Sequence, residues 1–492
     1  MGVTTTSDLD PRARADDPGL LTPAQAGLLV DQYELVMAAS YLKRGRNEPA
    51  TFELSVRDLP SGRRWLLAAG LGPTLRLIEE LHFGTRELSY LREQGFDRRL
   101  VRYLERFRFS GDVDAMPEGT VVFAGEPLVR VTAPLVEAQL LETLLLNQIS
   151  FQTAIATKAA RIALAAGAGT PEGGRRVADF SARRGHGADA AMKAVRCAAL
   201  IGAAGTSNMA AAMRYGLRHV GTMAHSYVLS FATEADAFRA FLQDNPDHAV
   251  LLVDTYDVTC GVRAAIRASQ ETGITLQGVR LDSGDLLALS RATRRDLDDA
   301  GMSGVRIVAS GDLDEHRIAE LVSAGAPIDL WGVGTALGTS PDAPALSSIY
   351  KLVARCGDDG QWRPVAKRSS GKTTIGWPKQ VHRMVSDGVM RGDVVAHADE
   401  QLETGEPLLR AAMRAGSVVD ARHGRDASHC PALAGHAAID AARSRFRGQL
   451  SRPMVTPAWR RPTRRTAGLR RSEAASCGSL SARCSSSPTC RR

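Results

Sequence analysis

Short apolar runs typical of β-strands alternate with helical stretches over the middle of the chain. From residue 175 onward these runs lie at 177–180, 219–223, 249–253, 277–281, 305–309 and 328–333. Apolar residues recur with helical spacing between most of them, for example over 187–215, 261–272 and 313–324. Strands that alternate with helices predict parallel pairing, because parallel neighbours need a long crossover connection. Six such units fit either an α/β barrel or a doubly wound sheet.

The first 150 residues follow a different pattern. Segments 50–69 and 118–132 each predict two strands around a turn, at Pro-Ser-Gly in the first and at Ala-Gly-Glu-Pro in the second. A long helical pattern follows over 134–166, where apolar residues recur at spacings of three and four. We therefore expect a separate mixed α/β unit before the alternating region.

Polar residues follow each predicted strand of the alternating region. They are Ser-Ala-Arg-Arg at 181–184, Ala-His-Ser at 224–226, Asp-Thr-Tyr-Asp at 254–257, Asp-Ser-Gly-Asp at 282–285, Ser-Gly-Asp at 310–312 and Gly-Thr at 334–335. The carboxyl ends of strands in a parallel barrel open on one mouth, where active sites form. The repetition predicts a shared site, although a polar loop is the ordinary exit from any single strand.

The residue types in these clusters favour phosphate binding. Glycines such as Gly311 and Gly334 let backbone N–H groups close on an anion. Arg183, beside Arg184, can grip a phosphate or a carboxylate in bidentate fashion. The carboxylates at 282 and 285 would repel phosphate alone, so Mg²⁺ or ribose hydroxyls are their natural partners. Neither "SGD" nor "GVGT" is a Walker or Rossmann fingerprint, and turn formation is the alternative for each.

His225 stands between two small residues, Ala224 and Ser226, at the end of one predicted strand. An imidazole can act as acid, base or nucleophile near neutral pH. Next to phosphate-binding loops, a phosphohistidine is one hypothesis, and a purely structural histidine is the alternative.

Charge and composition narrow the classes of function. The net charge is +8, but residues 451–492 contain ten Arg and one Glu, so the other 450 residues sum to −1. A nucleic-acid-binding function would thus depend on this tail, and no nucleic-acid partner is expected for the body. Cysteines outside the tail are scattered without metal-type spacing. No apolar run approaches the roughly 18 to 20 residues of a membrane span, and residues 1–20 lack a signal-peptide core, so a cytoplasmic protein is expected.

Seven motifs in a fixed order resemble one family. They are "DQYELVMAASYL" (31–42), "DFSARRGHG" (179–187), "GTSNM" (205–209), "GTMAHSY" (221–227), "VDTYDV" (253–258), "GVRLDSGDL" (278–286) and "GVGT" (332–335). Together they closely resemble the nicotinate phosphoribosyltransferases, over about residues 25 to 385. The resemblance implies an α/β fold, with an irregular TIM-like α/β barrel joined to an N-terminal α/β sandwich domain. It also implies a homodimer with shared active sites.

The activity implied by this resemblance joins nicotinate to phosphoribosyl pyrophosphate, with ATP as co-substrate and Mg²⁺ as cofactor. The products are nicotinate mononucleotide and pyrophosphate, in the salvage route to NAD. Nicotinamide or quinolinate as the substrate and a catalytically inactive barrel are the alternatives.

The resemblance also implies roles for individual residues. His225 is the histidine that ATP phosphorylates, and Asp282 holds ribose hydroxyls or orients the base. Phe180 stacks on the pyridine ring, with Tyr33 of the other subunit as the opposing ring. The remaining implied substrate-binding residues are Arg183, Ser207, Ser226, Arg280, Ser283, Gly311, Asp312, Gly334 and Thr335. No metal ligands are assigned.

Two positions qualify the resemblance. Nicotinamide-using relatives have an aspartate where this chain has Ser207, and a carboxylate there would repel nicotinate. Ser181 stands where many members have glycine.

The expected organisation is a flexible N-terminus (1–24), an N-terminal domain (25–150), a barrel domain (151–385), a C-terminal segment packing back on the body (386–450) and a tail (451–492) that is disordered or out of frame.

Overall fold

The computed structural model describes residues 21–22, 26–167, 176–367, 369, 374–387, 389–419 and 445. The predicted tail (451–492) and residues 1–20 of the predicted flexible N-terminus lie outside the described residues. Among the described residues, no helix is both long and apolar enough to cross a membrane.

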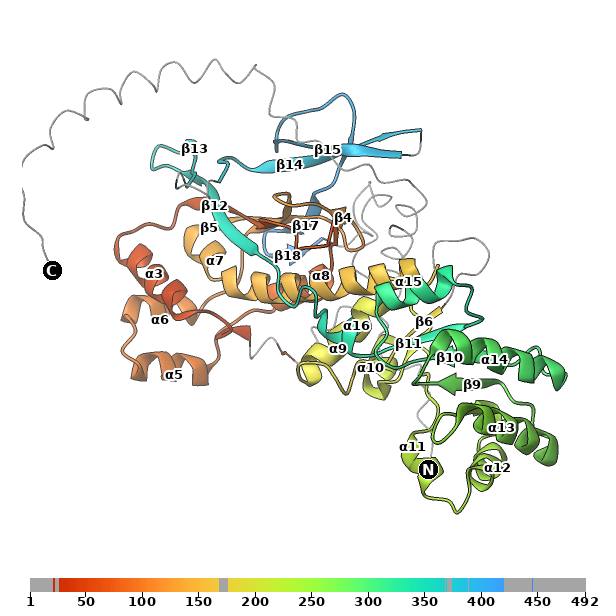
Figure 1. Cartoon of the computed structure of the whole chain (residues 1–492). Helices are drawn as coiled ribbons and strands as arrows, with labels where there is room; N and C mark the ends of the chain where they lie inside the picture. The colour runs from red at the N-terminus through yellow and green to blue at the C-terminus, as the bar shows by residue number, and fades with distance from the viewer. Residues whose placement is uncertain are drawn as a thin grey trace, which may run out of the picture.

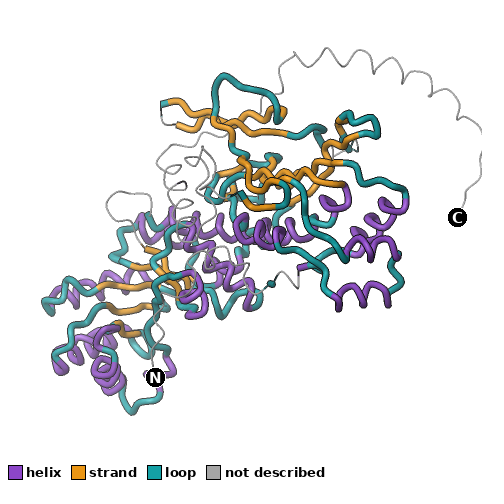
Figure 2. Tube along the Cα trace, turned by 180° about the vertical axis from the view of Figure 1, so that it is seen from behind, coloured by secondary structure: helices purple, strands orange, loops and turns teal. Residues whose placement is uncertain are grey.

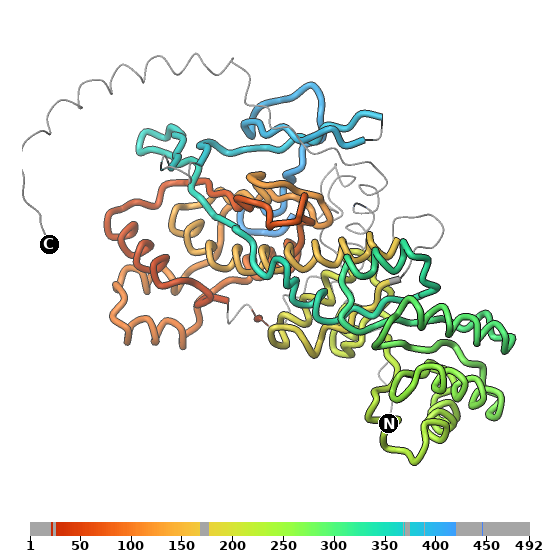
Figure 3. Tube along the Cα trace, in the orientation of Figure 1, coloured from red at the N-terminus to blue at the C-terminus, as the bar shows by residue number. Residues whose placement is uncertain are grey.

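An antiparallel sheet of seven strands forms the first layer of the N-terminal part, in the order β13-β12-β1-β5-β3-β17-β18. Its strands are β1 (Pro49–Val56), β3 (Asp112–Ala115), β5 (Pro127–Pro134), β12 (Ser348–Cys356), β13 (Trp362–Pro364), β17 (Arg410–Arg414) and β18 (Ser417–Val418). Late segments of the chain therefore complete a sheet that begins with early ones, and Figure 3 shows the teal and blue segments beside the red and orange ones.

Short helices and two small sheets surround this layer. The helices are α3 (Gln32–Lys43), α4 (Leu71–Glu79), α5 (Thr85–Glu93), α6 (Arg98–Leu104) and α7 (Leu135–Gln139). One small sheet pairs β2 (Leu66–Leu67) with β4 (Val121–Val122), and the other has β15 (Val389–His397), β14 (Lys379–Ser386) and β16 (Glu406–Pro407). Two strands form within each of the segments 50–69 and 118–132, as predicted, but the two in a segment pair with other strands rather than with each other.

Helix α8 (Glu142–Ala165) is the link between the two parts of the molecule. Leu144, Leu145 and Ile149 in its first half belong to the core of the N-terminal part. Ile155 and Ile162 in its second half belong to the core of the parallel sheet. One buried helix thus serves both cores, and Figure 1 shows it running from the N-terminal helices toward α15.

The second part is a six-stranded parallel sheet in the order β7-β6-β11-β10-β9-β8. Its strands are β6 (Arg176–Asp179), β7 (Gly205–Thr206), β8 (Val250–Leu252), β9 (Gly278–Leu281), β10 (Arg306–Ala309) and β11 (Leu330–Val333). The helices around it are α9 (Ala188–Leu200), α10 (Met209–Tyr215), α11 (His225–Leu229), α12 (Glu234–Asp244), α13 (Val258–Thr272), α14 (Leu286–Asp299), α15 (Glu315–Ser323) and α16 (Thr335–Thr339). Figure 2 shows these helices flanking the sheet. The predicted α/β class, with a TIM-like part and an N-terminal part, is confirmed.

Two local predictions in this region are wrong. The segment 219–223 forms only an isolated parallel bridge, between His219 and Thr206, because its pairing stops before Gly221 and glycine weakens a strand. The stretch 187–215 is not one helical run, since the short strand β7 separates α9 from α10. His219 nevertheless lies 6.0 Å from His248, measured between ring centroids, just before β8. The segment therefore spans the space between the edge strands β7 and β8, and the sheet curls into a half-barrel.

Candidate functional site

The polar residues that follow the parallel strands meet at one edge of the sheet. Arg280 on β9 is the centre of this cluster. Its Nε donates to Ser310 Oγ at 2.8 Å, its Nη1 to Thr222 Oγ1 at 3.2 Å and its Nη2 to Asp282 Oδ1 at 2.6 Å. Residues from β9, from the end of β10 and from the irregular segment 219–223 are thereby joined across the mouth.

Asp282 carries a negative charge in this network. Burial of its carboxyl group would raise its pKa, but hydrogen bonds from Ser310 and Arg280 and the nearby His225 outweigh that effect. The pKa of Asp282 consequently lies below its ordinary value. Asp285, by contrast, caps α14 by accepting from the N–H groups of Leu287 and Ala288, so its carboxylate serves the helix.

Asp254 is a site residue to which the sequence analysis gave no role. It follows β8, and its Oδ2 accepts from the backbone N–H of Asp282 at 3.0 Å and from Ser283 Oγ at 2.6 Å. Its Oδ1 is buried and has no hydrogen-bond partner among the described residues. The only sequence signal was its place directly after a buried strand, within "VDTYDV".

His225 begins the short helix α11 and faces these carboxylates. Its Nε2 lies 3.9 Å from Asp254 Oδ1 and 4.0 Å from Asp282 Oδ2, while its Nδ1 lies 3.2 Å from Thr255 Oγ1. The side chain is 42% exposed, so a ligand in the mouth can reach the ring. The two carboxylates favour the tautomer with hydrogen on Nε2, which leaves the Nδ1 lone pair to accept from Thr255.

Phe180 lies against the same cluster from β6. The guanidinium carbon of Arg280 is 5.5 Å from the centroid of its ring. Asp179, just before it, is buried and accepts from Thr206 Oγ1 at 2.7 Å and from the N–H of Ser181 at 3.1 Å. Burial raises the pKa of Asp179, and its hydrogen bonds oppose that rise. Asp179 and Thr206 thus fix the loop after Phe180, in which the buried Ser181 packs against Gly338.

Two loops with special backbone geometry complete the edge. Gly311 has φ +91°, and a Cβ there would lie 1.9 Å from the carbonyl oxygen of Asp282, so only glycine fits. Asp312 follows in the left-handed region at φ 45°. Gly334 precedes α16, whose first residue is the exposed Thr335. These loops leave backbone N–H groups of the kind that bind an anion.

Arg183, Ser207 and Ser226 are exposed at this edge, as are Gly311, Asp312 and Thr335. The side chain of Arg183 has no ion pair with any described residue. Ser283 is also exposed and is held by its hydrogen bond to Asp254. The structure therefore brings together twelve of the thirteen predicted site residues at the carboxyl edge of the sheet.

Tyr33 is the residue that the structure does not bring to this edge. It lies on α3, which packs near the start of α8, where Thr143 donates to Glu34, whereas β6 lies toward the other end of α8 (Figure 1). Burial and the neighbouring Glu142 and Glu34 raise the pKa of Tyr33, although the residue as a whole is 46% exposed.

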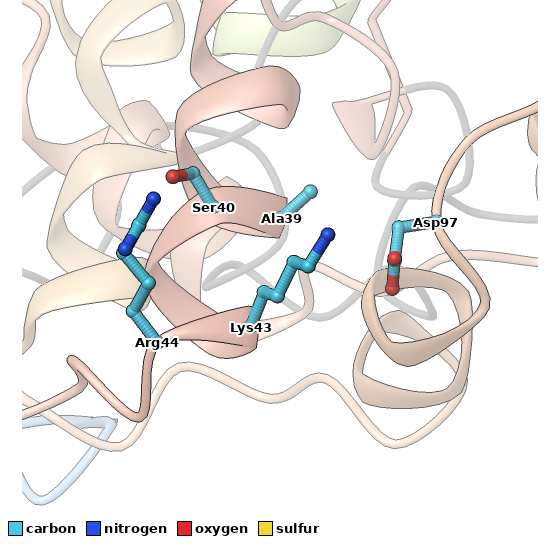
Figure 4. Close-up of a pocket in the computed structure, with 5 residues that line it drawn as sticks. All are labelled: Ala39, Ser40, Lys43, Arg44 and Asp97. Atoms are coloured by element: carbon cyan, nitrogen blue, oxygen red, sulfur yellow. The ribbon is translucent and has the colours of Figure 1, made fainter.

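A hollow of about 450 Å³ lies at the end of α3, far from the mouth. It is lined by Ala39, Ser40, Lys43, Arg44 and Asp97, with Lys43 and Asp97 on opposite sides of the gap (Figure 4). None of the strand-end residues lines it. The chemistry therefore places the candidate active site at the sheet edge instead.

Comparison with known proteins gives consistent matches. The family model described as the nicotinate phosphoribosyltransferase (NAPRTase) N-terminal domain matches residues 28–150, and that of the NAPRTase family matches 175–368. Nicotinate phosphoribosyltransferase pncB2 of Mycobacterium tuberculosis is 47% identical over 411 residues, covering 83% of this chain and 84% of the relative. The Bacillus subtilis nicotinate phosphoribosyltransferase is 42% identical, covering 77% and 78%. The crystal structure of human nicotinic acid phosphoribosyltransferase has a TM-score of 0.71 at 27% identity, covering 88% of this chain and 97% of that one.

Proposed function

The chain belongs to the nicotinate phosphoribosyltransferase family, and we propose that it transfers phosphoribosyl from phosphoribosyl pyrophosphate to nicotinate. The products are nicotinate mononucleotide and pyrophosphate, in the salvage of NAD. The observation that carries this proposal is the contact of Arg280 with both Phe180 and Asp282 at the mouth of the half-barrel. An aromatic face, a cation and a ribose-binding carboxylate are thus within one cluster.

Nicotinate binds against Phe180 in this proposal. The pyridine ring stacks on the phenyl ring, and the guanidinium group of Arg280 attracts the nicotinate carboxylate. Three N–H groups of Arg280 are already used, which leaves two of its five for a ligand. Ser207 at the edge adds no negative charge, so the site accepts the acid.

The phosphoribosyl group lies across the two glycine loops. Backbone N–H groups near Gly311 and Gly334 cradle the 5′-phosphate, with Asp312 and Thr335 beside them. Arg183, exposed and without an ion-pair partner among the described residues, supplies a cation for phosphate oxygens. Asp282 and Ser283 lie between the loops and His225, where ribose hydroxyls need acceptors and donors.

Mg²⁺ suits the carboxylates next to His225. Asp254 Oδ1 is a buried acceptor that has no hydrogen-bond partner among the described residues, and Asp282 is ionised, so these two residues would hold the ion. Bound Mg²⁺ would neutralise charge on pyrophosphate as it leaves. No group of three or more His, Cys, Asp or Glu side chains among the described residues is arranged to hold a metal, so water and substrate oxygens would have to supply the other ligands.

The bond from C1 of the ribose to pyrophosphate breaks as the pyridine nitrogen forms the new C–N bond. The transition state resembles an oxocarbenium ion, so the chain mainly positions the ring nitrogen and stabilises the leaving group. No side-chain nucleophile toward the sugar is required. Tyr33 serves the site only if a second subunit supplies it, which makes a homodimer with shared sites part of this proposal.

In this proposal ATP acts by phosphorylating His225. The Nδ1 lone pair attacks the γ-phosphorus, ADP leaves, and the phosphoimidazole adds negative charge and acceptor oxygens beside the pyrophosphate position. The tautomer with hydrogen on Nε2, which the neighbouring Asp254 and Asp282 favour, leaves Nδ1 as the nucleophilic nitrogen. Binding energy of ATP thereby biases the site toward tight substrate binding and product formation.

The test supplies purified protein with phosphoribosyl pyrophosphate, Mg²⁺ and ATP, and offers nicotinate, nicotinamide or quinolinate separately. We expect nicotinate mononucleotide from nicotinate, at a rate that ATP increases. Absence of this product would refute the proposal. Activity with only nicotinamide or only quinolinate would show that this other pyridine is the substrate. The cytoplasmic location stays a prediction.

A further inference from the structure

Five charged side chains form a partly buried network behind the two glycine loops. Its members are Arg63, Lys158, Arg161, Glu315 and Asp342. The side chains of Arg63 and Lys158 are 0% and 3% exposed. The network belongs neither to the mouth nor to a surface ion pair, and the catalytic proposal does not use it.

One half of the network holds α15. Glu315 is the first residue of this helix, which begins just after the loop of Gly311 and Asp312. Its Oε2 lies 2.6 Å from Lys158 Nζ and its Oε1 lies 2.9 Å from Arg161 Nε, both on α8. Figure 1 shows α15 beside the end of α8. The position of the first loop is therefore tied to α8.

The other half holds the end of α16, which follows the loop of Gly334. Just beyond this helix, Ser340 is fully buried with φ 47°, and its Oγ accepts from Arg63 Nη2 at 2.5 Å. Asp342 Oδ2 lies 3.0 Å from Arg63 Nε, and Asp342 Oδ1 lies 2.9 Å from Lys158 Nζ. Arg63 also donates to the carbonyl oxygen of Ala154 on α8 at 3.1 Å.

Lys158 is the cation that makes short contacts with both halves, whereas Arg161 lies 2.9 Å from Glu315 but 3.8 Å from Asp342. The single ammonium group of Lys158 pairs with Glu315 behind one loop and with Asp342 behind the other. Burial would raise the pKa of Asp342, but hydrogen bonds from Arg63 and Lys158 outweigh burial and hold it well below the usual range. A buried ion pair is weak evidence for stability, because apolar residues of similar volume often do as well. A network that joins two separate loops is better explained by the geometry that it imposes.

We propose that Lys158 is a positioning residue that sets the separation of the two phosphate-binding loops. The proposal rests on the proposed function, in which both loops bind one phosphoribosyl group. Hydrogen-bond donors must be held within a few tenths of an ångström to grip the same phosphate, and rigid supports behind a site provide this. Loss of the ammonium group removes the closest cation between the buried Glu315 and the more exposed Asp342 and leaves only the longer contact of Arg161 with Asp342 to join them, so α15 and α16 move relative to each other.

Lys158→Met is the decisive variant, with steady-state kinetics in which each substrate is varied separately. We expect the KM for phosphoribosyl pyrophosphate to rise by about tenfold or more, since small displacements of binding groups carry penalties of this order. The KM for nicotinate should change by less than about twofold, because Phe180 and Arg280 are not part of the network. Lys158→Arg retains the charge and should recover most of the loss. Glu315→Gln and Asp342→Asn, which each release one loop, replace Lys158→Met if it does not fold.

Arg383→Met is the matched control. Arg383 is a cation with 5% side-chain exposure, paired with Asp393 at 2.6 Å on β14 and β15, away from both loops. The Arg383→Met variant should have a lower melting temperature, without a selective rise in the KM for phosphoribosyl pyrophosphate. Lowered stability with an unchanged KM for phosphoribosyl pyrophosphate in Lys158→Met would overturn the proposal, as would an equal rise in both KM values. If the wild-type chain lacked transfer to nicotinate, the function would fail separately, and calorimetric binding of phosphoribosyl pyrophosphate with Mg²⁺ would still test the network.

Discussion

The ring of Phe180 lies directly on the backbone of Gly332. A Cβ at position 332 would stand 2.4 Å from Phe180 Cε2, a separation that no real packing allows. The ring keeps its place beside Arg280 only because the neighbouring strand carries a hydrogen at this point. The glycine of the "GVGT" motif thus has a steric role in the proposed nicotinate site.

Gly332→Ala should displace the Phe180 ring and weaken nicotinate binding. We expect the KM for nicotinate to rise by about tenfold, because overpacking of this kind costs about 1–3 kcal/mol. Steady-state kinetics at saturating phosphoribosyl pyrophosphate measure the effect. Gly304→Ala is the control, since a Cβ there meets nothing within 4 Å. Equal nicotinate KM values in both variants would show that the ring position does not matter.

His225→Ala should abolish acid-labile labelling by γ-labelled ATP and remove the stimulation by ATP. Slow, ATP-independent transfer should remain, because the pyridine nitrogen is the nucleophile toward the sugar. Phosphate should be found on Nδ1, which phosphorus NMR of the labelled chain can distinguish from Nε2. Thr255→Val, which removes the hydroxyl 3.2 Å from Nδ1, should slow labelling without preventing it. Unchanged labelling in His225→Ala would place the phosphate on another residue.

Ser207→Asp should change the choice between acid and amide substrates. A carboxylate at this exposed position repels nicotinate and can accept from the amide N–H of nicotinamide. We expect kcat/KM for nicotinate to fall by about tenfold or more, which corresponds to about 1.4 kcal/mol, while that for nicotinamide rises. Ser207→Asn, without the charge, controls for size. A similar loss in both variants would mean that charge at this position does not select the substrate.

Glu126 should make the fold less stable in alkaline solution. Burial and the nearby Asp393 raise the pKa of this carboxyl to about 8. A raised pKa in the folded state means that its contribution to stability is fully present below the unfolded pKa and is lost as pH rises through about 8. Melting temperatures between pH 6 and pH 9.5 should fall more for the wild type than for Glu126→Gln. Parallel curves for the two proteins would contradict the assignment.

Much of the candidate site could be predicted because strand ends are visible in a sequence. Asp282, Gly311 and Gly334 each follow a short apolar run, and parallel pairing places such ends on one edge. Asp254 and Ser310 follow strands in the same way but received no role, because a polar residue after a strand is also ordinary loop chemistry. Their hydrogen bonds to Asp282 and Ser283 join different strands and cannot be read from local sequence.

The sequence by itself determined the α/β class, the order of the motifs and the residue types at the mouth, because hydrophobic periodicity and turn chemistry are local. Only the tertiary structure decided that β12 and β17 return to the N-terminal sheet and that 219–223 spans the half-barrel as an irregular segment. It likewise placed Lys158 between Glu315 and Asp342, which are 27 residues apart in sequence. Contacts of this kind depend on how segments distant in sequence pack together, and the local pattern of a single sequence does not predict them.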